Sequence, residues 1–444
     1  MRRTTVLRSH WLAMLAMTVG LSWGSAPARA QEGGGRGMRP APTLNEVVAI
    51  RAGHLFDPRS GTLLANQIIL IKGDRITAVG SGLAIPAGAQ VIDLSRATVL
   101  PGLIDGHVHL LDESQRRHIP VSNGGQGEAS INNSARPFMA YYAMMKDLNA
   151  GFTTIVDLGH DYTYATVDLR NAIDDGLVQG PRMQVAGPIL VNEVESPRYP
   201  NSRKIDTPEK AREAVRELKA HGVNWIKIQS TAAYTMKPGS MDSTPTISLE
   251  MTKAIVDEAH KNGLKVACHS YSGEGLHNCI EGGADAPQHG MYLDDQSLKE
   301  ILDRHIALGT PLFDMRGSEK AEMEKFGESR MHLMEQAWKK AFKAGVKLEF
   351  SSGAQADSTG FPHGDQVHYF AVFVKWGMTP AQALKLAMID NAEIIGWADR
   401  VGSVEKGKFA DIIAVAGDPL ADITEIERVK FVMKGGEVVR NDFK

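Results

Sequence analysis

The sequence predicts a mixed α/β protein, a (β/α)8 TIM barrel with a small β-sandwich domain built from both ends of the chain. Between residues 98 and 400, eight short apolar segments alternate with amphipathic helical patterns, which is typical of a barrel of parallel strands. Strand-like segments flank this region at 45–97 and 401–444. A doubly wound open sheet is the alternative, and it is disfavoured because no glycine-rich phosphate loop follows any expected strand.

Length and composition set the outer limits. The chain has 444 residues, enough for a barrel with an accessory domain, and it is 43% hydrophobic and 23% charged, as in ordinary globular proteins. The net charge of −3, without a basic patch, gives no reason to expect nucleic acid as a partner. Cys268 and Cys279 are too few for a disulfide framework, so we expect two buried small apolar side chains.

Residues 1–30 are predicted to be a secretory signal peptide, not part of the fold. Arginines near the start precede a mostly apolar segment at 11–23, and Ala28-Arg29-Ala30 fits a cleavage site. The apolar segment is too short to span a membrane comfortably, so we expect no stable membrane anchor after cleavage. We expect an exported protein, periplasmic or extracellular, with a flexible lead-in at 31–44. The Arg2-Arg3 pair leaves the choice between the general and twin-arginine export routes open.

The two terminal segments are predicted to share one β-sandwich. Gly73-Asp74 and Gly435-Gly436 suit tight turns between apolar segments. A single small sandwich built from both ends is the economical arrangement. The expected strands are 47–51, 67–72, 75–79 and 90–93 in the first segment, and 410–416, 429–434 and 437–440 in the second.

The barrel is predicted to occupy residues 98–400. Thr207-Pro208-Glu209 is a good helix start, with an N-cap, a proline and an early acid, and Ser248 opens the next helix. In such barrels the chemistry lies at the carboxyl ends of the strands. The eight expected strands are 98–109, 153–158, 183–190, 225–229, 265–269, 284–289, 310–313 and 347–351.

Histidines end several of these strands. His107 and His109 end the first, and alternate residues of a strand point to the same face. His269 ends the fifth strand and His289 the sixth. Neutral imidazole is a common ligand for zinc and similar metals, so the four together predict a metal site. His269 or His289 taken alone would more readily be a structural histidine, and the pair of His107 and His109 taken alone could equally be two polar residues at a strand end.

A lysine lies inside the fourth expected strand, in Trp225-Ile226-Lys227-Ile228. A lysine in an apolar strand is costly unless its charge is paired or its amine is modified. In a dry pocket the pKa of the amine falls, and a neutral amine can add carbon dioxide to give a carbamate that could bridge two cations. The alternative is an ordinary lysine that is salt-bridged or reaches solvent.

Together these segments resemble the amidohydrolase superfamily, in the branch of imidazolonepropionase-like and Xaa-Pro dipeptidase (prolidase)-like enzymes. The resemblance covers roughly residues 45–442 and is specific to the superfamily and branch, but not to a substrate. The segments that carry it are 100–109 (LPGLIDGHVH), 225–228 (WIKI), 266–270 (VACHS), 282–285 (GGAD), 288–290 (QHG), 361–364 (FPHG), 402–411 (GSVEKGKFAD) and 417–419 (GDP).

The resemblance implies a metal-dependent hydrolase acting on carbon–nitrogen bonds. It assigns His107 and His109 to one divalent ion and His269 and His289 to a second, bridged by carboxylated Lys227. Zinc is favoured by the histidine-rich ligands, with manganese or cobalt as alternatives. A hydroxide between the metals would attack the substrate carbonyl, and an eighth-strand aspartate would carry the proton to the leaving nitrogen.

The position of that aspartate has two solutions. Counting from 344–347 places it at Gly353, whereas counting back from Pro362-His363-Gly364 places it at Asp357. We take Asp357 as the catalytic residue and the last metal ligand, which requires an insertion in this loop. The alternative is that the ligand is lost.

Three further side chains are candidates for substrate binding. His160 follows the second expected strand and His363 lies just past the eighth, so either could orient a substrate. A structural hydrogen bond is the alternative for both. Tyr234, seven residues after Lys227, could reach a substrate carboxylate.

The expected function is therefore that of a secreted binuclear-metal amidohydrolase acting on a small molecule. It would cleave a C–N amide bond adjacent to a carboxylate, as in a dipeptide or an N-acyl amino acid. One alternative is a non-peptide substrate on the same site, such as an ochratoxin-like aryl amide, a cyclic amide or a lactone. Another is a catalytically silent binding protein that has lost the base. The sequence defines neither the exact substrate nor the oligomeric state, and a homo-oligomer is left open.

Overall fold

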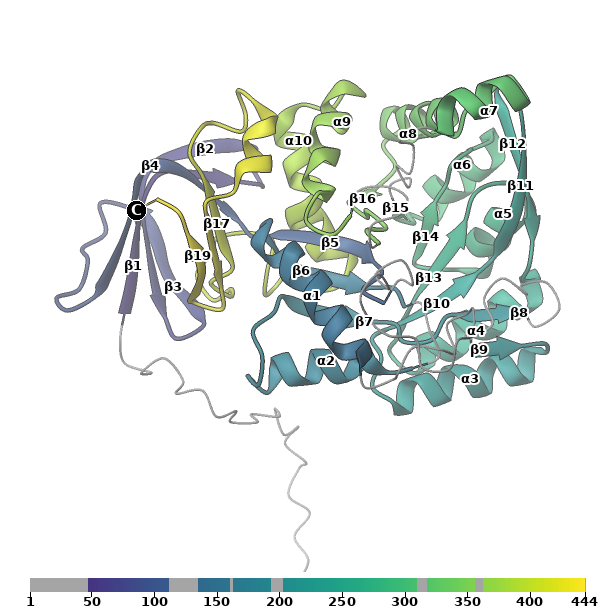
Figure 1. The fold of residues 1–444 in the computed structure, drawn as a ribbon, viewed down its shortest axis with the longest axis horizontal. Helices are drawn as coiled ribbons and strands as arrows, with labels where there is room; N and C mark the ends of the chain where they lie inside the picture. The colour runs from purple at the N-terminus through teal and green to yellow at the C-terminus, as the bar shows by residue number, and fades with distance from the viewer. Residues whose placement is uncertain are drawn as a thin grey trace, which may run out of the picture. The chain divides into compact units, whose positions relative to one another are not determined.

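The computed structural model describes residues 47–111, 135–159, 163–192, 203–309, 318–355 and 362–443 (Figure 1). Besides the expected strand at 310–313, four predicted features lie outside these ranges. They are the signal peptide, the lead-in, His160 and Asp357.

Strands from both ends of the chain form one seven-stranded sheet, in the order β19-β18-β17-β4-β1-β2-β3 (Figure 1). The long strand β4 joins the two groups, because it pairs parallel with β1 on one side and antiparallel with β17 on the other. The predicted division into a separate sandwich domain stays a prediction. The bounds are β1 Val47–Asp57, β2 Thr62–Lys72, β3 Arg75–Ser81, β4 Gln90–Pro101, β17 Ile412–Val415, β18 Phe431–Lys434 and β19 Glu437–Asn441.

A partly buried ion pair connects this sheet to the neighbouring strand β7. The Arg182 guanidinium donates to both carboxylate oxygens of Asp411, at 2.7 and 3.1 Å, and lies 3.3 Å from the centre of the Phe409 ring. A bidentate pair of this kind fixes orientation as well as distance. The sheet has its own core of alternating apolar side chains, including Ile50, Ile69, Ile71, Ile412, Phe431 and Met433.

The middle of the chain supplies short parallel strands in three sheets, β5-β6-β7, β14-β13-β10-β8-β9 and β15-β16. Backbone hydrogen bonds span two of the gaps between them, from Asn224 to Val185 and from Gly106 to Phe350. The fold is therefore mixed α/β, and closure into a (β/α)8 barrel stays a prediction. The bounds are β5 Leu103–Val108, β6 Phe152–Asp157, β7 Arg182–Val185, β8 Leu190–Asn192, β9 Arg203–Ile205, β10 Trp225–Gln229, β13 Lys265–Ser270, β14 Ala286–His289, β15 Leu308–Gly309 and β16 Leu348–Glu349.

Several expected strands differ from the structure, and the expected strand 90–93 is continuous with the start of 98–109 in β4. The segment 98–109 is two strands, since β4 ends at Pro101 and β5 begins at Leu103. Gly102 separates them where a Cβ would meet Thr153 Oγ1 at 2.0 Å, so only glycine fits as the chain passes between sheets. The segment 183–190 is split between β7 and β8. The seventh strand lies at Leu308–Gly309, and residues 310–313 are outside the described ranges.

Helices lie between the parallel strands, and both predicted helix starts are confirmed. The Thr207 side chain accepts a hydrogen bond from the backbone of Lys210, and Ser248 does the same for Met251. A hairpin, β11 Thr231–Lys237 with β12 Ser240–Pro245, follows β10. The helices are α1 Arg136–Asn149, α2 Ala165–Asp174, α3 Pro208–Ala220, α4 Leu249–Lys261, α5 Gly273–Gly282, α6 Asp295–Asp303, α7 Ser318–Phe326, α8 Arg330–Ala344, α9 Tyr369–Lys375, α10 Pro380–Lys385 and α11 Asn391–Ile394.

The cysteines differ from expectation. Both are fully buried, but the structure pairs Cys268 of β13 with Cys279 of α5 as a disulfide, so the prediction of two separate thiols is wrong. The pairing is local, because a strand and the helix that follows it bring the two residues together. Within the described part of the chain, none of the helices has the length and apolar character needed to cross a membrane.

His277 predicts a pH-dependent contact between α5 and α6. Its Nδ1 lies 3.1 Å from Glu300 Oε2 and its Nε2 lies 3.2 Å from Asp294 Oδ2. Partial burial lowers the pKa of His277, but hydrogen bonds with Glu300 and Asp294 outweigh it and raise the pKa above its usual 6.5. The stabilisation that charged His277 gives the folded state is complete below the pKa that His277 has in the unfolded chain. It is lost as the pH rises through the higher pKa that His277 has in the folded chain.

We therefore expect the thermal midpoint of the wild type to exceed that of His277→Gln most at about pH 6, with the difference shrinking toward about pH 9. Calorimetry across this range measures it. A difference independent of pH would contradict an ionic role for His277.

Candidate metal centre

The site is built on two histidines at the end of β5. His107 and His109 are both buried, and their Nε2 atoms lie 3.0 Å apart. The predicted convergence of these two side chains is therefore present. Asp105 fixes the backbone below them, since its Oδ1 accepts from the backbone N–H groups of His107 and Ser352, each at 3.0 Å. Burial raises the pKa of Asp105 to about 7, although its hydrogen bonds from Ser352 oppose this shift.

The hydrogen-bond partners of the two rings define where their protons lie. His109 Nδ1 is 2.5 Å from the Gly159 carbonyl oxygen, which can only accept, so Nδ1 carries the proton. His107 Nδ1 is 2.9 Å from Gln288 Oε1 and donates to it in the same way. Both Nε2 atoms then carry lone pairs. Two lone pairs facing each other at 3.0 Å repel unless a proton or a cation lies between them.

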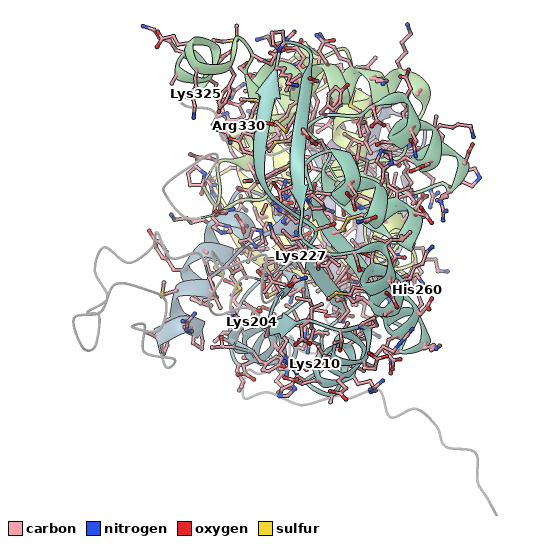
Figure 2. The ribbon with its side chains drawn as sticks, turned by 90° about the vertical axis from the view of Figure 1, so that its right-hand side faces the viewer. Lys204, Lys210, Lys227, His260, Lys325 and Arg330 are labelled. Carbon is pink, nitrogen blue, oxygen red and sulfur yellow. A yellow bond between two sulfur atoms is a disulfide. The ribbon has the colours of Figure 1, made fainter. Side chains whose placement is uncertain are left out.

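Lys227 joins this pair from β10. Its side chain is buried, and its Nζ lies 3.0 Å from His107 Nε2. Figure 2 shows Lys227 near the middle of the molecule in that view, whereas Lys210 and Lys325 lie toward opposite edges. Burial lowers the pKa of Lys227 to about 7, while the charges of Glu349 and Asp157 act in the opposite direction. A large share of this lysine is therefore neutral near neutral pH.

A second histidine pair lies beside the first. The rings of His269, at the end of β13, and His289, at the end of β14, have centroids 4.4 Å apart, and His289 is 5.4 Å from His107. His289 has a φ of 81°, which is strained for a residue other than glycine. Its two buried ring nitrogens have no hydrogen-bond partner among the described residues. A buried, unpaired imidazole held in a strained backbone indicates a functional constraint.

The donors fit a cation in their chemistry. Within the described residues, no set of three or more His, Cys, Asp or Glu side chains already has the arrangement of a metal site. The histidine rings contact one another directly, and the fifth donor is a lysine. Burial, followed by nearby positive groups, lowers the pKa of both His107 and His289 well below 6.5. Neutral imidazoles with inward lone pairs are what a divalent ion requires.

Both positions considered for the family aspartate can now be placed. Gly353 lies against the first histidine pair, where its backbone N–H donates to the His107 carbonyl at 2.7 Å. It has no side chain to act on a proton. Asp357 lies in 356–361, outside the described residues, and its role as base and ligand stays a prediction.

Of the three predicted substrate-binding residues, the structure describes two. Tyr234 is half-buried on the hairpin, and its ring packs edge-on against Tyr271 with centroids 5.8 Å apart. His363 is buried, with Nδ1 2.8 Å from Asp147 Oδ2 and Nε2 donating to the His109 carbonyl at 3.1 Å. Burial lowers the pKa of His363, but Asp147 outweighs it and raises the pKa above 6.5. His363 therefore supports the His109 backbone, and its contact with substrate stays a prediction.

Sequence reasoning missed three residues around the histidines. Tyr271 lies near both rings of the second pair, with centroids 4.6 Å from His269 and 5.5 Å from His289. Gln288 and Glu349 are buried behind His107. Burial raises the pKa of Glu349 to about 7, although its hydrogen bond from Gln288 lowers it. A charged residue inside an apolar strand was the signal that singled out Lys227, and Glu349 carries the same signal.

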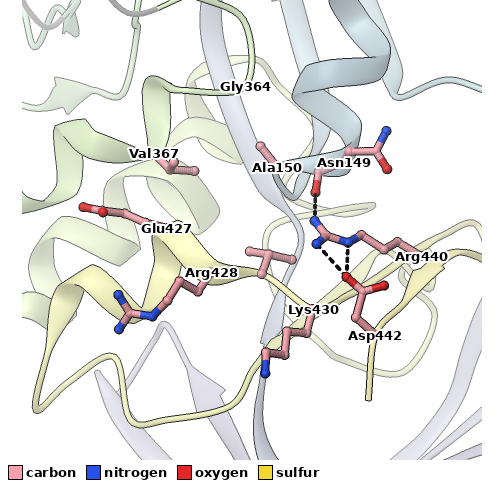
Figure 3. Close-up of a pocket in the computed structure, with 10 residues that line it drawn as sticks. Asn149, Ala150, Gly364, Val367, Glu427, Arg428, Lys430, Arg440 and Asp442 are labelled. Atoms are coloured by element: carbon pink, nitrogen blue, oxygen red, sulfur yellow. Dashed lines mark hydrogen bonds and ion pairs between the residues drawn. The ribbon is translucent and has the colours of Figure 1, made fainter. Parts of the chain in front are cut away.

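A separate pocket of about 320 Å³ lies where the end of α1 meets residues 427–442 (Figure 3). Arg440 donates to the Asn149 carbonyl at 3.2 Å and pairs with Asp442 at 2.6 Å within it. None of the predicted site residues lines this pocket. It is therefore distinct from the histidine cluster.

Comparisons with known proteins match this chain to one family. The model of the amidohydrolase family matches residues 98–439. An ochratoxinase from Aspergillus niger is 26% identical over 435 residues, covering 89% of this chain and 87% of that protein. An imidazolonepropionase from Fusobacterium nucleatum is 23% identical over 405 residues, covering 84% and 91%. A solved structure described as a Xaa-Pro dipeptidase with bound methionine has a TM-score of 0.76 and 26% identity, covering 89% of this chain and 100% of its own. These matches confirm the predicted superfamily and branch.

Because His289 is strained, we predict that replacing it keeps or raises the stability of the metal-free protein but weakens metal binding. A strained backbone costs on the order of 1–3 kcal/mol, and asparagine tolerates a positive φ better than most residues. We expect the free energy of unfolding of metal-free His289→Asn to be equal to that of the metal-free wild type or higher. Zinc should raise the thermal midpoint of the wild type clearly more than that of the variant.

Thermal unfolding in zinc and in excess chelator measures both effects. His260→Asn, at an exposed histidine outside the cluster, is the matched control and should respond to zinc like the wild type. Equal stabilisation of His289→Asn and the wild type by zinc would remove His289 from the ligand set.

Proposed function

The chain belongs to the amidohydrolase family, and from this membership we propose that it is a secreted binuclear-metal hydrolase that cleaves an amide bond adjacent to a carboxylate. Its family and its named relatives establish that it is a hydrolase acting on carbon–nitrogen bonds. The metals, the substrate class and export are the proposal.

The observation that carries the proposal is the convergence of the predicted donors. His107, His109, Lys227, His269 and His289 come from four different strands, yet their rings and the amine form one contiguous buried cluster. Burying five basic groups together is costly in a protein kept only for its fold. Their arrangement is therefore best explained if these five side chains bind metal ions.

The same residues would hold the ions. We assign His107 and His109 to one ion and His269 and His289 to the other, with Lys227 between them as a carbamate. Zinc is the favoured ion for imidazole donors. Two bound divalent ions would supply an activated water and polarise the scissile carbonyl.

The chain's own residues perform the remaining tasks. A neutral Lys227 amine is the form that reacts with carbon dioxide, and the lowered pKa of Lys227 supports this modification. Asp357 would accept a proton from the attacking water and deliver it to the leaving nitrogen. Tyr234, His160 and His363 remain the proposed substrate-binding residues, and Tyr271 joins them because its ring links Tyr234 to His269.

The proposed substrate class is drawn from the relatives. A dipeptide or an N-acyl amino acid is favoured, because prolidase-like structures are among the neighbours. An aryl amide of the ochratoxin type is the second candidate, since an ochratoxinase matches most of the chain. A cyclic amide or lactone on the same site remains the third. A catalytically silent binding protein is disfavoured by family membership.

Export is proposed on two grounds. The predicted signal peptide at 1–30 is the first. The Cys268–Cys279 disulfide is the second, because disulfides persist mainly in oxidising compartments.

The proposal predicts metal content and turnover together. Purified protein should carry close to two zinc ions per chain, measured by elemental analysis, and should hydrolyse members of a panel of dipeptides, N-acyl amino acids and aryl amides. His269→Ala and Lys227→Arg should each lower both quantities, because Lys227→Arg keeps a charge but cannot form the carbamate. His260→Asn should change neither. Full turnover in metal-free protein would contradict the proposal.

Asp357→Asn tests the assigned base. The substitution preserves the shape of the side chain but removes its proton acceptor, so kcat should fall by about 10²–10⁴-fold with metal content largely kept. Steady-state kinetics and elemental analysis measure the two quantities. A kcat within about threefold of the wild type would show that the site uses another base.

A further inference from the structure

We propose that Glu349 is a positioning residue that acts through Gln288 to hold His107 in the tautomer that can bind a metal. The inference rests on the proposed function, because it concerns one of the assigned ligands. It adds a buried amide and a buried carboxylate to the site.

The three residues form one hydrogen-bonded chain across three strands. His107 Nδ1, at the end of β5, lies 2.9 Å from Gln288 Oε1 of β14. Gln288 Nε2 donates to Glu349 Oε2 of β16 at 2.7 Å. All three side chains are at most 1% exposed, so water does not compete for these bonds.

The carboxylate of Glu349 determines which atom donates in each of these two hydrogen bonds. An ionised carboxylate can only accept, so Gln288 must turn its NH₂ group toward Glu349. The Gln288 carbonyl then faces His107, which must donate from Nδ1. Nε2 is left with its lone pair directed at His109 Nε2 and Lys227 Nζ, each 3.0 Å away. The reverse tautomer would place a proton where an ion would bind.

Two glycines make room for this arrangement. A Cβ on Gly106, the residue before His107, would meet Glu349 Oε1 at 2.2 Å. A Cβ on Gly309 of β15 would meet Gln288 Oε1 at the same distance. Neither glycine has a positive φ, so it is space and not backbone conformation that requires them. Gln288 and Glu349 therefore occupy space that is left by glycines on two neighbouring strands.

A purely structural carboxylate is a poor alternative at this position. Burying a charge is costly, and an apolar side chain of similar volume would fill the space with less penalty. A carboxylate behind a ligating histidine, by contrast, sets ring orientation and tautomer in metal sites. Here the carboxylate acts through an amide instead of touching the histidine.

The test compares His107 in the wild type and in Glu349→Gln, both free of metal. The chain has 15 histidines, and selective ¹⁵N labelling with long-range ¹H–¹⁵N correlation distinguishes protonated from unprotonated ring nitrogens. The His107→Asn spectrum assigns the signals. Spectra are recorded at about pH 8, where Glu349 favours its ionised form. The wild type should show His107 protonated at Nδ1 alone.

Glu349→Gln should lose this single tautomer, because an amide at position 349 can donate as well as accept and no longer forces Gln288 into one orientation. Competition with a chromogenic chelator should then show zinc affinity weaker by about 10–100-fold. Gln288→Leu provides a second variant, since it removes the connecting amide at similar volume and should give the same two changes. Circular dichroism establishes which variants are folded.

Glu425→Gln is the matched control. Glu425 accepts from the Gly417 N–H at 3.1 Å and pairs with Arg428, away from the histidines. This variant should keep both the wild-type His107 tautomer and the wild-type zinc affinity.

A wild-type His107 protonated at Nε2, or an unchanged tautomer in a folded Glu349→Gln or Gln288→Leu variant, would overturn the proposal whatever happens to zinc affinity. Failure of the proposed function gives a different result, in which the wild type neither binds zinc nor hydrolyses the panel. The tautomer comparison uses metal-free protein and decides the role of Glu349 in either case.

Discussion

The constraint on which the site depends is the burial of five basic groups in one small volume. Four imidazoles and an amine come from different strands and are almost removed from water. Protonating them all would concentrate positive charge in a medium of low polarity, so the pKa values of Lys227, His107 and His289 are all lowered, chiefly by burial. Burial therefore favours the neutral forms of His107 and His289 and weakens the hold of Lys227 on its proton. A cation satisfies this set of basic groups, whereas packing alone leaves it costly.

The surroundings of the cluster follow from that constraint. Carboxylates lie behind the donors: Asp105 holds the backbone of His107, Asp147 holds His363 against the His109 carbonyl, and Glu349 lies beyond Gln288. Each contacts a group that orients a donor, and none contacts the converging nitrogens directly in a described hydrogen bond. Carboxyl groups thus lie behind the donors and orient them, while the inner positions are left to the imidazoles and the amine.

Much of this could be predicted from local patterns. The alternation of side chains along a strand placed His107 and His109 together, and a charged residue in an apolar segment singled out Lys227. Glu349 carries the same signal, but its role could not be predicted from the sequence. Its partner Gln288 is 61 residues away, and a contact between two strands produces no periodic pattern in the sequence. The expected strand 98–109 is too long for a related reason. The chain passes from one sheet to another at Gly102, and the close contact with Thr153 that requires glycine there is visible only in the structure. The Cys268–Cys279 disulfide was missed because two cysteines in a sequence carry no information on their pairing.

The division between ligands and base has a physical origin. The described donors lie on or at the ends of hydrogen-bonded strands, so their positions are fixed by backbone pairing and can be inferred from motif and spacing. The position that one anchor assigns to the base is Gly353, whose N–H is bonded to the His107 carbonyl and whose φ is 63°. Glycine there bonds its backbone N–H to the His107 carbonyl and has no side chain that could carry a proton. A segment between strands is not fixed by strand register, so counting along the sequence from two sides gives two answers, Gly353 and Asp357. The choice of Asp357 over loss of the ligand stays a prediction.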